Sequence, residues 1–149
     1  MLDHFTIKTS KVEMTAQFYE QSIGLYRGPR PQFSLPGAWM YNDDGHPILH
    51  LVSLSEGYTT EASVAYFRCK GDQSGTQTIG YIFFEGDHLA STQQHFVRQK
   101  IPFRERVIPE INVHQLFLDD PNGITIEITF PFSPDNKIVG TPLPVVDVI

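Results

Sequence analysis

The sequence predicts an α+β fold made of two similar halves, because one order of elements occurs twice. A strand near the N-terminus, a helix and a strand ending at residues 48–51 are followed, after a polar stretch, by a strand at 79–84, a second helix and a strand at 125–128. Such repetition indicates that each half is one structural unit. The chain of 149 residues is long enough for one good core. We therefore expect a single domain with module 1 at about 1–52, a linker at about 53–77, module 2 at about 78–132 and a C-terminal tail at 133–149.

The first predicted strand and helix follow from two different periodicities. Residues 2–9 alternate, so that Phe5 and Ile7 share one face of a strand and His4 lies on the other. Ser10 is placed to cap a helix, and Met14 recurs with later apolar residues at helical spacing. This half therefore begins with a strand that packs its apolar face against an amphipathic helix.

A hairpin completes the first half. The Pro-rich stretch 28–31 reads as a loop, and strand signals resume at 38–41. The polar turn 42–45 then leads into a strand at 47–52, in which His50 faces away from its leucine neighbours. We expect Trp39 and Tyr41 of this hairpin to be core or cleft-wall residues.

The second half repeats these signals. They are a strand at 79–84, a helix from Asp87 to about Lys100, and a hairpin of 114–118 and 124–130 around the turn 119–123. The stretch before it, 53–78, is rich in Ser, Thr, Gly and Gln, which is typical of a linker.

Parity along the strands predicts a polar sheet face. In the last strand Ile126 and Ile128 share one face and Glu127 takes the other, because successive strand side chains point to opposite faces. The same rule sends His4 and His50 to the side opposite the apolar one. A sheet with an apolar helix-covered side and a polar side is expected to line a cleft.

Composition and charge exclude several classes of function. The net charge of −6 gives no basic stripe for nucleic acid, and no apolar run approaches the ~20 residues of a membrane span. The N-terminal residues carry no secretory pattern, so we expect a cytoplasmic protein. The single cysteine, Cys69, allows no intramolecular disulfide.

The sequence resembles the vicinal oxygen chelate superfamily, which includes glyoxalases, bleomycin-resistance proteins and extradiol dioxygenases. The resemblance covers about residues 1–52 and 78–131. It is carried by Leu2-Asp3-His4-Phe5, Phe18-Tyr19, Gly24-Leu25, the strand Pro47–Val52 and above all Phe117-Leu118-Asp119-Asp120-Pro121-Asn122-Gly123-Ile124-Thr125-Ile126-Glu127-Ile128.

The resemblance implies two βαβββ modules that form a U-shaped metal cleft, commonly in a homodimer. It implies that His4, His50 and Glu127 are metal ligands, and such a set suits Zn²⁺, Ni²⁺, Mn²⁺ or Fe²⁺. The chain departs from the family at Gly80, which we match with His4 and where the family usually carries a ligand. A water, a substrate atom or His114 could fill that place, or the metal could have been lost.

Three hypotheses about function follow. The first is a metal-dependent lyase or isomerase of glyoxalase type that acts on a small α-hydroxy-carbonyl substrate, with Glu127 as the base. The second is a metal-free cleft that binds a planar aromatic compound through Trp39, Tyr41 and Phe84. The third, a ring-cleaving dioxygenase, is disfavoured by Gly80. Taken singly, the histidines could also be structural.

Some further residues are candidates for substrate binding. Arg104 and Arg106 carry guanidinium groups that suit a carboxylate or phosphate, although surface ion pairs are the commoner role. With Arg104 we place His114, Trp39 and Tyr41 in the expected substrate site.

Overall fold

The computed structural model describes residues 2–32, 36–53 and 81–144 of the chain. The chain divides into two compact units, one of residues 1–78 with 121–123 and one of residues 79–120 with 124–149. The predicted linker and Cys69 lie outside the described residues, apart from Ser53.

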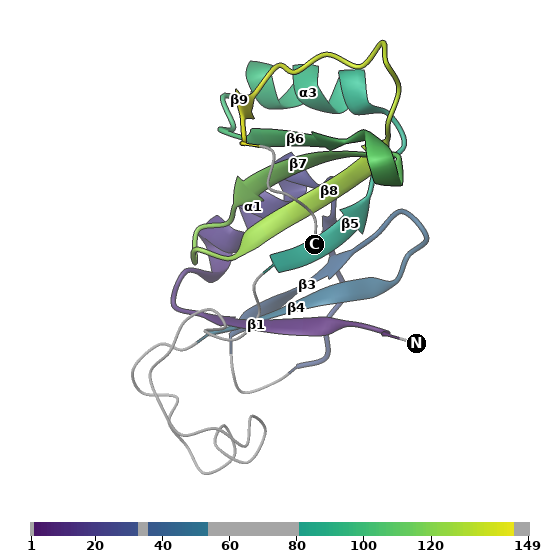
Figure 1. The fold of residues 1–149 in the computed structure, drawn as a ribbon. Helices are drawn as coiled ribbons and strands as arrows, with labels where there is room; N and C mark the ends of the chain where they lie inside the picture. Colours follow the sequence, from purple (N-terminus) through teal and green to yellow (C-terminus); the bar gives the residue numbers. More distant parts are fainter. Residues whose placement is uncertain (1, 33–35, 54–80, 145–149) are drawn as a thin grey trace. The chain divides into compact units, whose positions relative to one another are not determined.

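The first unit holds one mixed sheet and one helix (Figure 1). Strand β1 runs parallel to β4, and the hairpin partners β3 and β2 continue the sheet in the order β1-β4-β3-β2. The elements are β1 (Phe5–Thr9), α1 (Val12–Ser22), β2 (Tyr26–Gly28), β3 (Gly37–Tyr41) and β4 (Pro47–Ser53).

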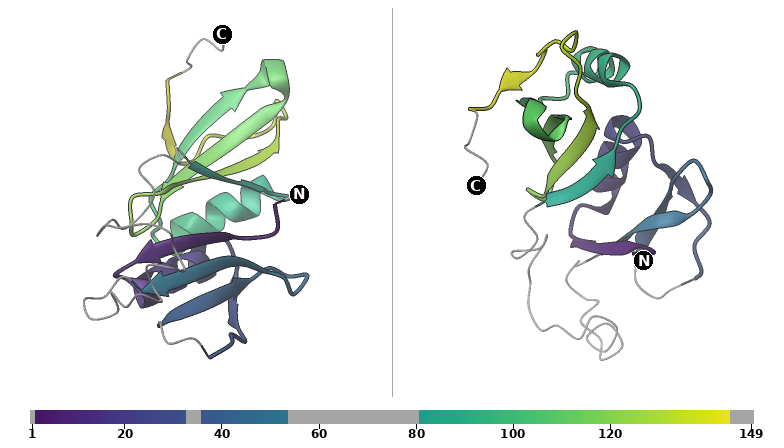
Figure 2. Two further views of the ribbon diagram at one scale, coloured as in Figure 1. Left: turned by 90° about the horizontal axis from the view of Figure 1, so that it is seen from below. Right: turned by 45° about the vertical axis from the view of Figure 1, so that its right-hand side comes forward.

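The second unit repeats this plan and adds one short strand. The sheet order is β5-β8-β7-β6-β9, with β5 parallel to β8. The segment after β8 passes along helix α3 and returns to pair β9 with β6 (Figures 1 and 2). The elements are β5 (Tyr81–Glu85), α3 (Leu89–Arg98), β6 (Arg104–Ile108), the 3₁₀ helix η1 (Pro109–Ile111), β7 (Val113–Asp119), β8 (Thr125–Pro131) and β9 (Thr141–Pro142).

The α+β fold of two βαβββ modules is therefore confirmed. The predicted first strand, both helices and both hairpins are present. Strands β2 and β6 were not predicted, because Gly28 precedes two prolines and β6 carries three charged residues in a row.

The buried face of α1 differs from the prediction. Met14 is 58% exposed, whereas Ala16 and Tyr19 are fully buried. Tyr19 supplies the large apolar contact, and the small Ala16 beside it lets the helix approach the sheet closely. Ser10 is not the cap: the helix begins after Lys11, whose backbone N–H donates to the hydroxyl of Thr9 at 2.9 Å.

The turn between β7 and β8 explains the most specific stretch of the sequence. The Asp120 carboxylate accepts the backbone N–H of Ile124 at 2.9 Å, and Gly123 adopts a φ of +80°, which favours glycine. Asn122 bonds to the hydroxyls of Thr9 and Thr15 at 2.6 and 3.1 Å. Asp120, Asn122 and Gly123 of this turn therefore each have a structural role.

Apolar residues of alternate parity form the core of each unit. In the first unit Leu49, Leu51 and Met40 are fully buried on the face that α1 covers. In the second unit Phe96 of α3 and Phe130 of β8 are almost completely buried. Among the described residues no helix is long and apolar enough to span a bilayer.

Candidate functional site

Three aromatic rings stack on the polar face of the first sheet. His50 pairs with Thr6 of β1 and with Trp39 of β3, and residues that pair across strands share a face. The His50 ring lies 4.2 Å from the Trp39 ring at an interplanar angle of 5°, and 4.2 Å from the His4 ring at 21°. The structure thus brings together His4, His50 and Trp39, as parity predicts.

His4 is oriented by its sequence neighbour. Its Nδ1 donates to the Asp3 carboxylate at 2.8 Å, and this hydrogen bond lowers the pKa of Asp3. A histidine that donates one ring N–H to a carboxylate presents the other nitrogen with its lone pair, which is the usual arrangement of a metal-binding histidine. The Nε2 of His4 is therefore set up as a donor atom.

His50 carries a buried nitrogen without a partner. The residue is 7% exposed, and within the described part of the chain its Nε2 has no hydrogen-bond partner. Burial, followed by the nearby His4 ring, lowers the pKa of His50, although the backbone of Pro47 acts in the opposite direction. The imidazole is therefore neutral near pH 7, and its lone pair is available. An unpaired buried polar atom costs free energy, so its retention calls for an explanation.

Glu127 lies on the polar face of the second sheet, between Phe83 of β5 and Phe117 of β7. Its Oε1 accepts the Gln115 amide at 2.5 Å and the Thr129 hydroxyl at 3.1 Å. No described residue donates to Oε2. Glu127 is 5% exposed. Its neighbours in the sheet hold Oε1 in place, which leaves Oε2 for a ligand.

Gln115 and Arg106 extend this polar row. The Nε of Arg106 donates to Oε1 of Gln115 at 2.8 Å, and the guanidinium carbon lies 5.3 Å from the centre of the Phe117 ring. Sequence reasoning missed Gln115, although the parity of β7 sets it on the same face as Glu127. Arg106 was predicted only as one of two guanidinium groups.

Arg104 is paired within the protein. Its Nη1 and Nη2 donate to the two carboxylate oxygens of Asp119 at 2.6 and 3.0 Å. The bidentate bond lowers the pKa of Asp119 and raises that of Arg104. The terminal nitrogens of Arg104 are therefore already bonded to a carboxylate of the protein, and we do not include Arg104 in the proposed substrate site.

His114 lies on the opposite face from Glu127. It pairs across the strands with Phe130, is 0% exposed, and its Nε2 donates to the Glu105 carboxylate at 2.7 Å. Strand β7 places residues of even number, such as His114 and Leu116, on the apolar side. His114 thus belongs to the core of the second unit, and we do not include it in the proposed substrate site.

Of two further aromatic candidates, Tyr41 is held by contacts within the first unit, and Phe84 lies on the apolar face of the second sheet. The Tyr41 hydroxyl donates to the Pro29 carbonyl at 2.5 Å, and its ring stacks on Tyr26. Phe84 pairs with Ile128 on the apolar face, whereas Phe83, 51% exposed, lies beside Glu127. Phe83 is therefore the aromatic residue of β5 that faces the polar side.

The strand register also corrects the match for His4. Thr6 pairs with His50, and Phe83 pairs with Glu127, the equivalent of His50. Counting back two residues in each strand matches His4 with Tyr81. The predicted match with Gly80, which lies outside the described residues, is therefore wrong by one position, a shift that would move a side chain to the other face.

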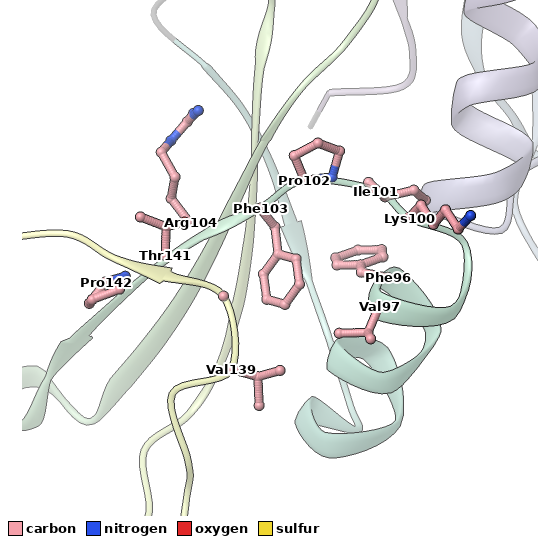
Figure 3. A pocket seen from close by; sticks show the side chains of 11 residues that line it. Phe96, Val97, Lys100, Ile101, Pro102, Phe103, Arg104, Val139, Thr141 and Pro142 are labelled. Atoms are coloured by element: carbon pink, nitrogen blue, oxygen red, sulfur yellow. The ribbon is translucent and has the colours of Figure 1, made fainter.

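No group of three or more His, Cys, Asp or Glu side chains is arranged to hold a metal within residues 2–32, 36–53 and 81–144. A surface hollow of about 610 Å³ lies elsewhere, in the second unit, between α3 and β9. Figure 3 shows Phe96, Phe103, Val97 and Val139 around it, with the Arg104 side chain directed away from them. None of the candidate ligands lines this hollow.

The model of the Glyoxalase/Bleomycin resistance protein/Dioxygenase superfamily matches residues 1–128 of this chain. A protein of Arabidopsis thaliana described as "Glyoxylase I 4" is 25% identical over 131 residues, which are 85% of this chain and 68% of that protein.

Solved structures share the fold at lower identity. A glyoxylase/bleomycin resistance protein/dioxygenase domain from Frankia sp. EAN1pec aligns with a TM-score of 0.62 and 12% identity, covering 88% of this chain and 91% of that one. Lactoylglutathione lyase from Agrobacterium tumefaciens aligns with a TM-score of 0.58 and 17% identity, covering 85% and 90%. These likenesses concern the fold alone.

Proposed function

Because the chain belongs to the Glyoxalase/Bleomycin resistance protein/Dioxygenase superfamily, we propose that it is a metal-dependent lyase or isomerase of glyoxalase type. Its substrate is a small molecule with an α-hydroxy-carbonyl group. The observation that carries this proposal is the buried Nε2 of His50, which has no partner among the described residues and lies in a ring stacked on His4.

The proposed ligands are of the chemical types that bind divalent ions such as Zn²⁺, Ni²⁺, Mn²⁺ or Fe²⁺. His4 and His50 each present an imidazole nitrogen, and Glu127 presents Oε2, a set of two nitrogens and one oxygen that these ions accept. An ion held by these three residues would polarise the substrate carbonyl. The lowered pKa of His50 supports the proposal, since no proton has to leave it near pH 7.

Glu127 is the proposed base. Gln115 and Thr129 hold Oε1, which fixes the orientation of the carboxylate. If Glu127 loosens from the ion, its Oε2 would take the proton from the carbon next to the carbonyl and return it to the neighbouring carbon. Phe83 and Phe117 on either side of Glu127 would keep water from this carbon.

The experiment is metal analysis of the purified protein. We expect about one equivalent of transition metal per chain, lost in the His50→Ala and Glu127→Ala variants. His46→Ala is the matched control, because His46 is exposed in the turn before β4. Absence of metal after incubation with all four ions, or equal loss in the control, would overturn the proposal.

A second candidate is metal-free binding of a planar aromatic compound. The flat stack of Trp39, His50 and His4 supports it. It predicts that a chelator leaves binding unchanged and that Trp39→Ala abolishes it. We do not propose dioxygenase chemistry, because that reaction calls for a ligand at the start of the second module, where Tyr81 replaces the usual histidine.

We further propose that the protein is a cytoplasmic homodimer, in line with the habit of this superfamily. Light scattering on the purified chain tests the dimer: a mass of about twice 16.9 kDa is expected, and the mass of a single chain would contradict it.

A further inference from the structure

Arg106 is the one guanidinium of strand β6 that no described carboxylate neutralises. Arg104, two residues earlier on the same face, is neutralised by Asp119, whose two carboxylate oxygens accept its hydrogen bonds. Among the described residues, Arg106 contacts only the Gln115 side chain, by a hydrogen bond, and the Phe117 ring. A partly buried cation without an anion is costly, and this suggests that its counter-ion arrives with a ligand.

The guanidinium is held in a fixed orientation. Its Nε is occupied by Gln115, while the Phe117 ring supports one face. The two terminal nitrogens, Nη1 and Nη2, have no partner in the part of the chain that the structure describes. The end of the guanidinium group is therefore available to a ligand, and its two N–H donors match the two oxygens of a carboxylate.

The position of Arg106 relates it to Glu127. Strand pairing sets Arg106 opposite Gln115, and Gln115 opposite Thr129, next to Glu127 on β8. Strands β6 and β8 are two strand spacings apart, about 10 Å, and Glu127 lies two residues along β8 from the position opposite Arg106. The Gln115 amide bonds to both side chains, and this neutral group prevents Arg106 and Glu127 from neutralising each other directly.

We propose that Arg106 forms a carboxylate subsite beside Glu127, so that the substrate is a small carboxylic acid whose reacting carbon lies a few bonds from the acid group. The inference rests on the proposed function for the role of Glu127. The subsite itself depends only on residues of the second unit. Phe117 and the half-exposed Phe83 give the body of the acid an apolar surface beside Glu127.

The test is a titration of metal-free, chelator-treated protein followed by NMR, including the Nε–Hε signals of the arginines. The probes are mandelate, which carries a carboxylate and a hydroxyl, its neutral analogue mandelamide, and phenyl phosphate. We expect mandelate to shift the Arg106 signal and to bind at least about ten-fold more tightly than mandelamide, since a charge-assisted bidentate bond is lost with the amide.

Variants separate the two arginines. Arg106→Gln is expected to weaken mandelate binding about ten-fold or more, and Arg106→Lys by less, because it keeps the charge but loses the fork. Arg104→Gln, the matched control, is expected to change binding less than two-fold. The amide region of each NMR spectrum shows whether the variant is folded.

Three results would overturn the inference. They are equal binding of mandelate and mandelamide, unchanged binding in a folded Arg106→Gln variant, and an equal loss in Arg104→Gln. Binding of phenyl phosphate alone through Arg106 would overturn the carboxylate assignment. The titration contains no metal, so its result does not depend on the metal site. A protein that binds no metal but still binds mandelate through Arg106 would contradict the proposed function and support this subsite.

Discussion

The two faces of the second sheet each bury a glutamate, and the two glutamates differ in how completely they are bonded. Glu105, 1% exposed on the face beneath α3, accepts hydrogen bonds from Gln93, His114, Val139 and Gly140. Glu127 on the polar face has donors for one oxygen only among the residues that the structure describes. The difference teaches that a buried carboxylate with every lone pair used holds the fold, whereas one with an unused oxygen is a candidate for chemistry.

Replacing Glu105 should have the largest effect on stability. Glu105→Gln removes a buried charge from its imidazole partner and sets an amide N–H₂ against the donors of the C-terminal segment. We expect a loss of about 3–5 kcal/mol in the free energy of unfolding, measured by urea denaturation. Glu110→Gln, at an exposed residue of η1, is the control and should change it by less than about 0.5 kcal/mol.

A smaller loss is expected at Gln93, which joins α3 to the same carboxylate. Its amide donates to Glu105 at 2.9 Å and to the carbonyl of Lys137 at 2.7 Å. Gln93→Ala should cost about 1–3 kcal/mol, because two buried bonds are lost and two acceptors remain. The same change at the exposed neighbour Gln94 is the control. Equal melting temperatures for the two variants would contradict a structural network around Glu105.

The matching change on the polar face should separate stability from function. Glu127→Gln keeps an acceptor for Gln115 and Thr129, so we expect unfolding to change by less than about 1 kcal/mol. Metal binding and any turnover should be lost. A loss of stability as large as that of Glu105→Gln would remove the distinction between the two faces.

The smallest effect is expected at the exposed ion pair. Arg104→Gln should cost no more than about 0.5 kcal/mol at pH 7, because solvent screens the pair. Arg104 lowers the pKa of Asp119 in the folded protein, so the contribution is complete above the ordinary Asp pKa and is lost as the pH falls through the lowered one. The difference between wild type and variant should therefore stay constant from pH 7 down to the ordinary Asp pKa and shrink as the pH falls further, as thermal melts over a pH series would show. A difference that persists in acid would rule out the ion pair as its source.

The sequence predicts strands whose apolar and polar residues alternate, and it predicts less where a charge is buried. The parity of β8 places Glu127 correctly, and the alternation in β1 places Ile7 in the core. Strand β6 is not predicted, because the charged residue Glu105 lies on its apolar side. The tertiary partners His114 and Gln93 compensate the burial of this carboxylate. No local pattern announces such partners.

The sequence predicts which strand positions carry the candidate site residues better than it predicts the hydrogen-bond partners of these residues. His4, His50 and Trp39 follow from strand parity and hairpin pairing. The match of His4 with Gly80 failed because the repeat alone does not fix the register to one residue. The division of labour between Arg104 and Arg106 depends on cross-strand neighbours, Asp119 in one case and Gln115 in the other, which lie 15 and 9 residues away along the chain.

The proposed metal site is tested most directly by following the six histidines by NMR during a Zn²⁺ titration of ¹⁵N-histidine-labelled protein. If His4 and His50 hold the ion, their Nε2 signals shift together and saturate at one equivalent, while those of His46, His88, His95 and His114 stay unchanged. No shift at His50, or equal shifts at all six, would contradict it.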